Sequence, residues 1–277
     1  MTIVAGFIYS QGMLLCSDME EGDGYSKKQV KKILHVDGNG WQLDIGGSGP
    51  SAVLALAYKK LKKEFFSYDC VEELAAGHEE SIRSVLLEMH ERYIWPSKST
   101  DYTTELLIGL NLKSSKQCLL YRTQEYIPQP VETFCCIGKG SILGNYFAST
   151  LYDPSVTRTQ MMFLGTFIIR EVKDFVPDCG QGTQMEFTMT SGKHFSVPYL
   201  IPREMETNEL PYSHEIKDWF RDSLPPFEYD DRWFDAWNKD EDPPDDIRFT
   251  EVWKEQEKFP HLKDVKQSVS EKSEPEP

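Results

Sequence analysis

The sequence predicts an α+β fold in which two stacked antiparallel sheets carry pairs of helices on their outer faces. Three observations predict it. Residues 1–46 favour short strands joined by turns, residues 50–96 change to a helical period, and strands followed by two helices return before a final hairpin. Blocks of consecutive strands favour antiparallel pairing, whereas a parallel sheet would alternate single strands with helices.

The strands are predicted from apolar and β-branched runs that turn residues separate. Ser10-Gln11-Gly12 joins the first two strands, and Asp37-Gly38-Asn39-Gly40 joins the next two, because Gly and Asn tolerate positive φ. The predicted strands cover residues 3–9, 13–16, 32–36, 41–45, 105–112, 117–122, 134–137, 185–190 and 194–197.

The helices are predicted from apolar residues that recur every three or four positions. Asp69 and Glu72 have the spacing of a capping box before the second helix, and Pro96 ends that helix. The four apolar faces consist of Leu54, Ala57, Leu61 and Phe65; of Leu74, Ile82, Val85, Met89 and Tyr93; of Ile142, Leu143, Tyr146 and Phe147; and of Met161, Leu164, Ile168 and Val172.

Composition divides the 277 residues into a globular part, residues 1–200, and an extension, residues 201–277. The extension has 11 Lys and Arg residues against 22 Asp and Glu residues, many prolines and four of the six tryptophans. Tryptophans need a surface that buries them, so we expect the extension to wrap the core or a neighbouring subunit. Residues 268–277 are charged and carry prolines, which predicts disorder.

Charge and cysteine content exclude several classes of function. A net charge of −15 argues against nucleic acid as a partner, because phosphate binding depends on clustered Lys and Arg. No apolar run is long enough to span a membrane and no signal peptide is visible, so we expect a soluble, cytoplasmic protein. The six cysteines form no CxxC pair and no zinc-binding spacing, which favours free buried thiols and predicts no metal site.

The amino terminus carries the strongest chemical signal. Removal of Met1 would leave Thr2 with a hydroxyl group beside its own free α-amine. Such an amine titrates near pH 8, about 7.7–8.0, so part of it is neutral and can accept the hydroxyl proton. One residue would then supply both nucleophile and base, although a threonine at this position is also an ordinary start for a strand.

Four short motifs extend this signal along the chain. They are residues 2–6 (TIVAG), 12–18 (GMLLCSD), 30–33 (VKKI) and 45–47 (IGG). In order and spacing they resemble the N-terminal third of proteasome β-subunits and their bacterial HslV relatives. The resemblance implies a four-layer αββα sandwich of the N-terminal nucleophile (Ntn) hydrolase type over roughly residues 2–200.

Carried over position by position, the resemblance implies three catalytic side chains: Thr2 as nucleophile, Asp18 as a buried carboxylate and Lys32 as its partner. A lysine near the hydroxyl group favours the deprotonated nucleophile, and the aspartate holds that ammonium group in place. The alternative is that Asp18 and Lys32 form an ion pair at a strand end without a catalytic role.

Further positions follow from the same resemblance. Gly46 and Gly47 lie where main-chain N–H groups stabilise the oxyanion, although they also suit a plain strand-to-helix turn. Asp44 matches a position that lines the substrate pocket, which suggests a preference for a basic or polar side chain, and Ser48 is a second substrate-binding candidate.

The chain also departs from the family pattern. Lys139 stands where the family has the serine of a Gly-Ser-Gly motif that supports the nucleophile, and Ser141 lies close by. The run near the fourth helix that completes this support is rearranged, so that either Asp174 or Asp178 could supply its aspartate. The acidic Met19-Glu20-Glu21 segment replaces a Ser-Arg pair.

The leading hypothesis is a threonine peptidase that forms an acyl-enzyme on peptide or protein substrates and needs no metal or cofactor. The resemblance implies a homo-oligomeric ring, with an unfoldase ATPase as a possible partner. One alternative is a catalytically silent scaffold subunit of the same fold. Another keeps the terminal nucleophile but acts on a small amide or acyl group.

Overall fold

Two five-stranded antiparallel sheets contain most strands of the computed structural model, which describes residues 2–22, 27–97 and 104–207. The first sheet has the order β10 (Phe134–Gly138), β1 (Ile3–Tyr9), β2 (Gly12–Asp18), β11 (Thr183–Met189) and β12 (His194–Ser196). The second has the order β5 (Ile33–Asp37), β6 (Trp41–Ser48), β7 (Glu105–Leu112), β8 (Gln117–Gln124) and β9 (Ile127–Val131). A short hairpin pairs β3 (Glu20–Gly22) with β4 (Lys27–Gln29).

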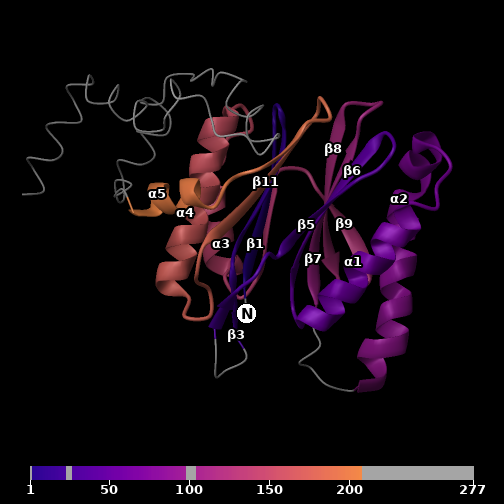
Figure 1. Ribbon diagram of the computed structural model, residues 1–277, viewed down its shortest axis with the longest axis horizontal. Helices are drawn as coiled ribbons and strands as arrows, with labels where there is room; N and C mark the ends of the chain where they lie inside the picture. The colour runs from indigo at the N-terminus through magenta and orange to yellow at the C-terminus, as the bar shows by residue number, and fades with distance from the viewer. Residues whose placement is uncertain (1, 23–26, 98–103, 208–277) are drawn as a thin grey trace, which may run out of the picture. The chain divides into compact units, whose positions relative to one another are not determined.

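Helices pack against both sheets (Figure 1). Helices α1 (Ser51–Phe65) and α2 (Val71–Met89) contact β6 and β9, whereas α3 (Ser141–Leu151) and α4 (Arg158–Phe175) contact β10 and β2. A π-turn (His90–Ile94) and a 3₁₀ turn (Trp95–Ser97) follow α2, and α5 (Leu200–Thr207) contacts α4 and β11. The described residues all belong to the unit Met1–Phe227.

The two sheets contact each other, and this contact explains why several strands are continuous apolar runs. Strand β1 contacts β6, β7 and β8, and Val4, Leu15, Leu107 and Leu120 belong to one buried cluster that draws on both sheets. Every residue of β2 and β11 is buried. A strand covered on both faces reads as a continuous run and not as an alternating pattern. The predicted α+β fold with antiparallel sheets is confirmed.

Some local predictions are wrong, and the start of α2 is one. The cap position of α2 is Cys70, without a side-chain cap hydrogen bond, so Asp69 and Glu72 form no capping box. The capping box lies at α4, where Thr157 Oγ1 accepts from the N–H of Gln160 at 3.3 Å and Gln160 Oε1 accepts from the N–H of Thr157 at 2.8 Å. The spacing of Asp69 and Glu72 alone could not distinguish a helix cap from a loop residue one position before the cap.

Helix α3 buries a different face from the predicted one. Ile142 is 85% exposed and Tyr146 is 65% exposed, whereas Gly144 and Ala148 are the buried residues. A Cβ atom at Gly144 would lie 2.8 Å from Cδ1 of Ile3, so the helix approaches β1 through its smallest residue. Hydrophobicity could not predict this face, because close approach requires small side chains.

The prediction for the cysteines and the extension is only partly tested here. All six cysteines are free thiols as predicted, although Cys70 is exposed. Helix α5 covers Leu200–Thr207, and its own residue Met205 is fully buried. The remainder of the extension, with its tryptophans and the predicted disorder of residues 268–277, lies outside the described residues.

Candidate active site

Three of the predicted residues meet at the start of β1. Oγ1 of Thr2 donates a hydrogen bond to Oδ1 of Asp18 at 2.5 Å and accepts one from Nζ of Lys32 at 2.6 Å. The same ammonium group donates to Oδ1 of Asp18 at 2.8 Å. Each side chain therefore contacts the other two, and all three are buried or nearly so.

The strand register explains why Thr2 and Asp18 meet. Strands β1 and β2 form an antiparallel hairpin in which Val4 is opposite Ser17, so the start of β1 lies beside the end of β2. Sixteen positions separate the two residues in the chain, and the Gly12 turn brings them together. This contact follows from the sequence once the hairpin is recognised.

Lys32 is positioned by a residue that the sequence analysis missed. Oε1 of Gln184 accepts from the backbone N–H of Lys32 at 2.8 Å and from that of Ile33 at 3.1 Å, and its Nε2 donates to the carbonyl of Ile33 at 2.8 Å. Gln184 belongs to β11, in the other sheet from β5. Because about 150 positions separate these residues, no local motif could reveal the contact.

Asp18 is fully buried and accepts hydrogen bonds on both oxygen atoms. Besides Thr2 and Lys32, Oδ1 accepts from the N–H of Ile3 at 2.9 Å, and Oδ2 accepts from the N–H groups of Glu20 at 3.2 Å and Gly180 at 3.1 Å. Such donors compensate a carboxylate for lost water and hold it in one orientation. The loop that contains Gly180 thus contributes directly to the site.

Gly46 and Gly47 lie in β6, beside the end of β5, where Gly46 is opposite Ile33. A Cβ atom at Gly46 would lie 2.6 Å from Cγ1 of Val4, and one at Gly47 would lie 2.4 Å from Cδ2 of Leu54. Real Cβ atoms do not approach this closely. Packing alone therefore favours glycine at Gly46, against the stiff side chain of Val4, whereas a larger residue at Gly47 would require Leu54 to move, whether or not their N–H groups also bind an oxyanion.

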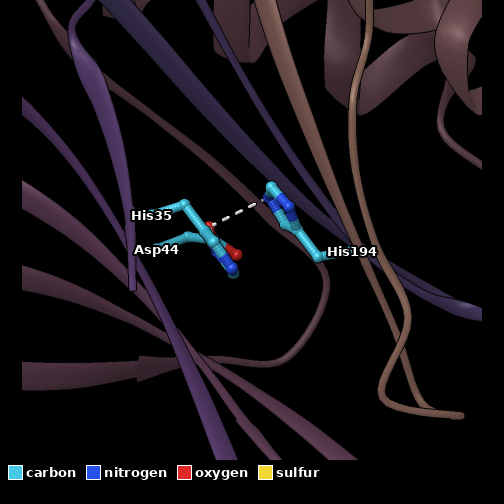
Figure 2. A group of neighbouring side chains, drawn as sticks. All are labelled: His35, Asp44 and His194. Atoms are coloured by element: carbon cyan, nitrogen blue, oxygen red, sulfur yellow. Dashed lines mark hydrogen bonds and ion pairs between the residues drawn. The ribbon is translucent and has the colours of Figure 1, made fainter. Parts of the chain in front are cut away.

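Asp44 lies in the interior and not on the wall of an open site. It is fully buried, its Oδ2 accepts from Thr188 Oγ1 at 2.5 Å, and its Oδ1 lies 2.7 Å from Nδ1 of His35 (Figure 2). Burial opposes protonation of His35, but the hydrogen bonds with Asp44 and Asp37 outweigh it and raise the pKa of His35. Asp44 therefore belongs to a polar cluster between the sheets, and its contact with substrate stays a prediction. Ser48, the last residue of β6, is partly exposed.

The predicted supporting residues are not hydrogen-bonded to Thr2. Ser141 begins α3, Asp174 is exposed and lies 3.8 Å from Arg170 on its own helix, and Asp178 forms an ion pair with Lys139. The hydrogen bond from Lys139 lowers the pKa of Asp178. Asp178 lies two positions from Gly180, which contacts Asp18, so Asp178 is the nearer of the two aspartates along the chain.

Comparison with solved structures identifies Anbu proteins as similar in fold. Anbu from Yersinia bercovieri, described as an ancestral beta-subunit, has a TM-score of 0.61 and 14% sequence identity, with 82% of this chain and 100% of that chain covered. Anbu from Hyphomicrobium sp. strain MC1 has a TM-score of 0.59 and 14% identity over 80% of this chain and 98% of that chain. A structure described as the helical assembly of the Anbu complex from Pseudomonas aeruginosa has a TM-score of 0.59 and 14% identity over 82% and 100%.

These likenesses establish the fold. They also correct the predicted family, because the similar structures are Anbu proteins and not the proteasome β-subunit and HslV relatives that the motifs indicated. The motifs around Thr2, Asp18 and Lys32 describe a shared arrangement of strands, and they cannot distinguish branches that keep it. No protein-family model matches the chain, and a comparison with curated proteins also finds no match.

None of the helices in the described ranges combines the length and the apolarity needed to cross a lipid bilayer.

Proposed function

We propose that this chain is a threonine-type N-terminal nucleophile hydrolase that cleaves peptide amides through Thr2 after removal of Met1. The observation that carries the proposal is the 2.6 Å contact between Lys32 Nζ and Thr2 Oγ1, with Asp18 bound to both groups. An ammonium group at this distance stabilises a developing alkoxide. Thr2 is 4% exposed in the unprocessed chain, so reaction depends on the removal of Met1.

The proposed reaction has two steps. The α-amine of Thr2 accepts the hydroxyl proton while Oγ1 adds to the carbonyl carbon of the substrate, and the N–H groups of Gly46 and Gly47 stabilise the oxyanion. The C–N bond then breaks, the leaving amine takes the proton, and the acyl group remains as an ester on Thr2. A water molecule hydrolyses this ester and restores the hydroxyl group. Ser48, at the exposed end of β6, is the proposed substrate contact.

We propose the four-layer αββα order of the Ntn hydrolases for residues 1–200, with residues 201–277 as an extension outside it. The contacts of α1 and α2 with one sheet, and of α3 and α4 with the other, support the layer order. Helix α5 supports an extension that begins on the surface of α4.

We also propose that the protein forms a homo-oligomer. The similar structure from Pseudomonas aeruginosa is described as a helical assembly. Head-to-tail contacts close into a ring when the rotation between subunits closes, and otherwise they build an open helix. The predicted ring is thus one of two assemblies to distinguish. An unfoldase ATPase partner and a cytoplasmic location stay predictions.

A catalytically silent scaffold subunit is the second candidate. The ion pair between Lys139 and Asp178 favours this second candidate, because it engages two residues of the loops that were expected to support Thr2. A silent subunit would keep the Asp18 and Lys32 contacts for stability alone, because removing one partner of a buried ion pair costs about 3–5 kcal/mol.

Two measurements test the proposal on the full-length protein. Intact mass reports whether Met1 is removed; if it remains, the α-amine is part of a peptide bond and the mechanism fails. Hydrolysis of a library of fluorogenic peptides then separates enzyme from scaffold. We expect turnover by the processed protein and none by Thr2→Ala. Equal turnover by both proteins would contradict the assignment.

A further inference from the structure

A second polar cluster lies between the two sheets, separate from Thr2. It consists of His35 on β5, Asp44 on β6 and His194 on β12, whose ligand atoms all lie within 4.8 Å of one another (Figure 2). The two imidazole rings are stacked, with centroids 3.4 Å apart. Both histidines are partly exposed at the side chain, whereas Asp44 is buried. Ions from solvent can therefore reach the two histidines of a site whose third member is a buried carboxylate.

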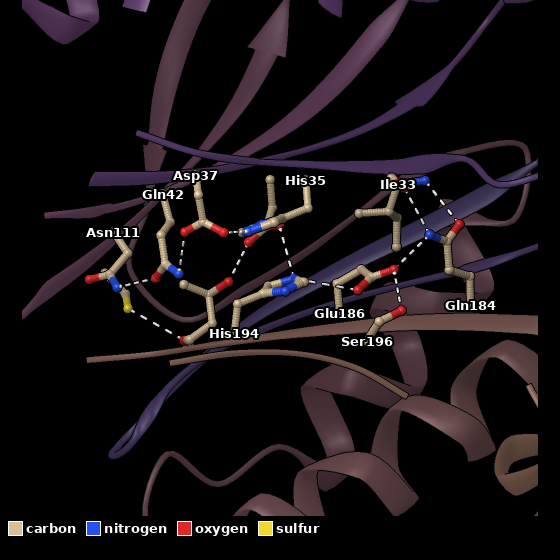
Figure 3. Close-up of polar contacts among 12 residues, drawn as sticks. Ile33, His35, Asp37, Gln42, Asn111, Gln184, Glu186, His194 and Ser196 are labelled. Atoms are coloured by element: carbon tan, nitrogen blue, oxygen red, sulfur yellow. Dashed lines mark hydrogen bonds and ion pairs between the residues drawn. The ribbon is translucent and has the colours of Figure 1, made fainter. Parts of the chain in front are cut away.

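The cluster brings a second buried carboxylate close to the two histidines. The buried carboxylate of Glu186 lies next to it, with Oε2 3.4 Å from Nε2 of His194 (Figure 3). In the described part of the chain, no lysine or arginine forms an ion pair with Asp44 or Glu186. Oε2 of Glu186 and Nε2 of His194 also make no hydrogen bond there. Two buried carboxylates beside two imidazoles are costly unless a cation, either a protonated ring or a bound ion, offsets their charge.

We propose that His35, Asp44 and His194 bind a divalent transition metal ion, with zinc as the best-fitting ion, and that the ion ties the two sheets together. Imidazole nitrogen and carboxylate oxygen together form a common ligand set for zinc. A dication there would compensate the charges of Asp44 and Glu186. The ion takes no part in the hydrolase chemistry that we propose at Thr2.

The outer contacts match those of metal-bound ligands. If Nδ1 of His35 binds the ion, its Nε2–H can donate to Oδ2 of Asp37, which lies 3.0 Å away. Metal-bound histidines commonly donate their second N–H to a carboxylate in this way. The other oxygen of Asp44 accepts from Thr188 at 2.5 Å, which orients this carboxylate. Thr188 thus orients Asp44, whereas the contact with Asp37 holds His35 in its present stacked position.

Distances within the cluster define the movement that binding requires. Ligand atoms around tetrahedral zinc lie about 3.3–3.5 Å apart, since each lies about 2.0–2.2 Å from the ion. Nε2 of His194 lies 3.6 Å from Oδ1 of Asp44, close to this spacing. Nδ1 of His35 lies only 2.7 Å from that oxygen, and the ring planes differ by 12°. The His35 ring must therefore turn out of the stack when the ion binds, and Glu186 or water completes the shell.

The position of the cluster links it to the first site. Nε2 of Gln184 donates to Oε1 of Glu186 at 2.8 Å, and its Oε1 accepts from the backbone N–H of Ile33 (Figure 3). The same oxygen accepts from the backbone N–H of Lys32. An ion that binds His194 and Asp44 fixes β12, which pairs with the strand of Gln184, against β6, which pairs with the strand of Ile33. We therefore infer a structural ion and not a catalytic one.

Metal binding by the full-length protein tests the inference. The protein is dialysed against chelator and titrated with Zn²⁺ in competition with a chromophoric chelator, and with Co²⁺ by visible absorption. We expect one equivalent of Zn²⁺, an intense tetrahedral Co²⁺ spectrum and a higher melting temperature with Zn²⁺. Less than half an equivalent, or a weak octahedral Co²⁺ spectrum, would overturn the inference.

Variants locate the ion. We expect His194→Gln to lower the Zn²⁺ affinity at least tenfold. Asp37→Asn, which changes the outer contact to His35 together with the contacts to Gln42 and Lys113, should lower it about 10–100-fold while the circular dichroism stays native. His90→Gln and the double variant His214→Gln/His261→Gln are controls that should bind Zn²⁺ as the wild type does. If the controls lose the ion, or if His194→Gln and Asp37→Asn both retain full affinity, the ion binds elsewhere and the assignment is wrong.

Discussion

The hydroxyl group of Thr2 contacts Asp18 at the end of β2 and Lys32 just before β5, and it lies 3.4 Å from the carbonyl oxygen of Ile3. Lys32 donates to it and Asp18 accepts from it, so its lone pairs and its proton both have fixed directions. This arrangement distinguishes a reactive hydroxyl group from an ordinary one, because a nucleophile needs a nearby charge that stabilises its deprotonated form.

Lys32→Met tests this contribution directly, with its neighbour Lys31 as a matched control. Lys31 is exposed, whereas the side chain of Lys32 is buried against Thr2. We expect Lys32→Met to lower kcat/KM for a peptide substrate by about 10²–10⁴-fold, the usual contribution of a positioned proton-transfer group. Lys31→Met should leave kcat/KM unchanged. Equal rates for both variants would show that Lys32 has no catalytic role.

The sequence predicted the central contacts of the site but not their supports. Thr2, Asp18 and Lys32 belong to local motifs whose spacing follows the strands. Gln184 is not predicted because its partners lie in another sheet, and the contact of Asp44 with Thr188 is missed because it depends on which face of β6 the side chain takes. A shift of one residue moves a side chain to the opposite face of a sheet.

Individual elements show how far local patterns reach. The apolar face of α4 was predicted correctly, since Met161, Leu164, Ile168 and Val172 are fully buried. The face of α3 is only half right, since Leu143 and Phe147 are partly buried whereas the close approach to β1 is made at Gly144. Periodicity identifies a helix that buries large residues, but it cannot identify one that packs through small residues.

The two helix starts allow a paired test of stability. Thr157→Ala removes the cap of α4, and we expect it to lower the free energy of unfolding by about 1 kcal/mol. Asp69→Ala removes a side chain that makes no cap hydrogen bond, so its effect in the same urea titration should be much smaller. A larger loss for Asp69→Ala would mean that the capping box lies at α2 after all.

Glu171 on α4 makes stability depend on pH. It is 5% exposed, its Oε1 has no hydrogen-bond partner among the described residues, and burial raises its pKa. Stability that depends on protonated Glu171 is present below its unfolded pKa of about 4.3 and is lost as pH rises through the raised folded value. We expect Glu171→Gln to stabilise the protein by about 1–3 kcal/mol at pH 7 and little at pH 4.

Thermal unfolding at the two pH values measures this difference. Glu91→Gln is the control, because Glu91 is exposed after α2 and should change the melting temperature at neither pH. If Glu171→Gln stabilises equally at pH 4 and pH 7, the ionised carboxylate is not the source of the effect.

At the scale of the whole molecule, the account predicts assembly. Native mass spectrometry should give a species that is a multiple of the 32.0 kDa chain. Electron microscopy then distinguishes a closed ring from an open helix, which differ only in whether the rotation between subunits closes. A monomer at micromolar concentration would contradict the proposed homo-oligomer.

The most direct test of the central claim is the reaction of the processed protein with a peptide epoxyketone. The hydroxyl oxygen of Thr2 adds to the ketone carbon and its α-amine opens the epoxide, so a ring forms only when both groups are free on one residue. We predict a mass gain of one inhibitor molecule that maps to the peptide beginning at Thr2 and is absent from Thr2→Ala. An unmodified wild-type protein, or an adduct that persists in Thr2→Ala, would contradict the account.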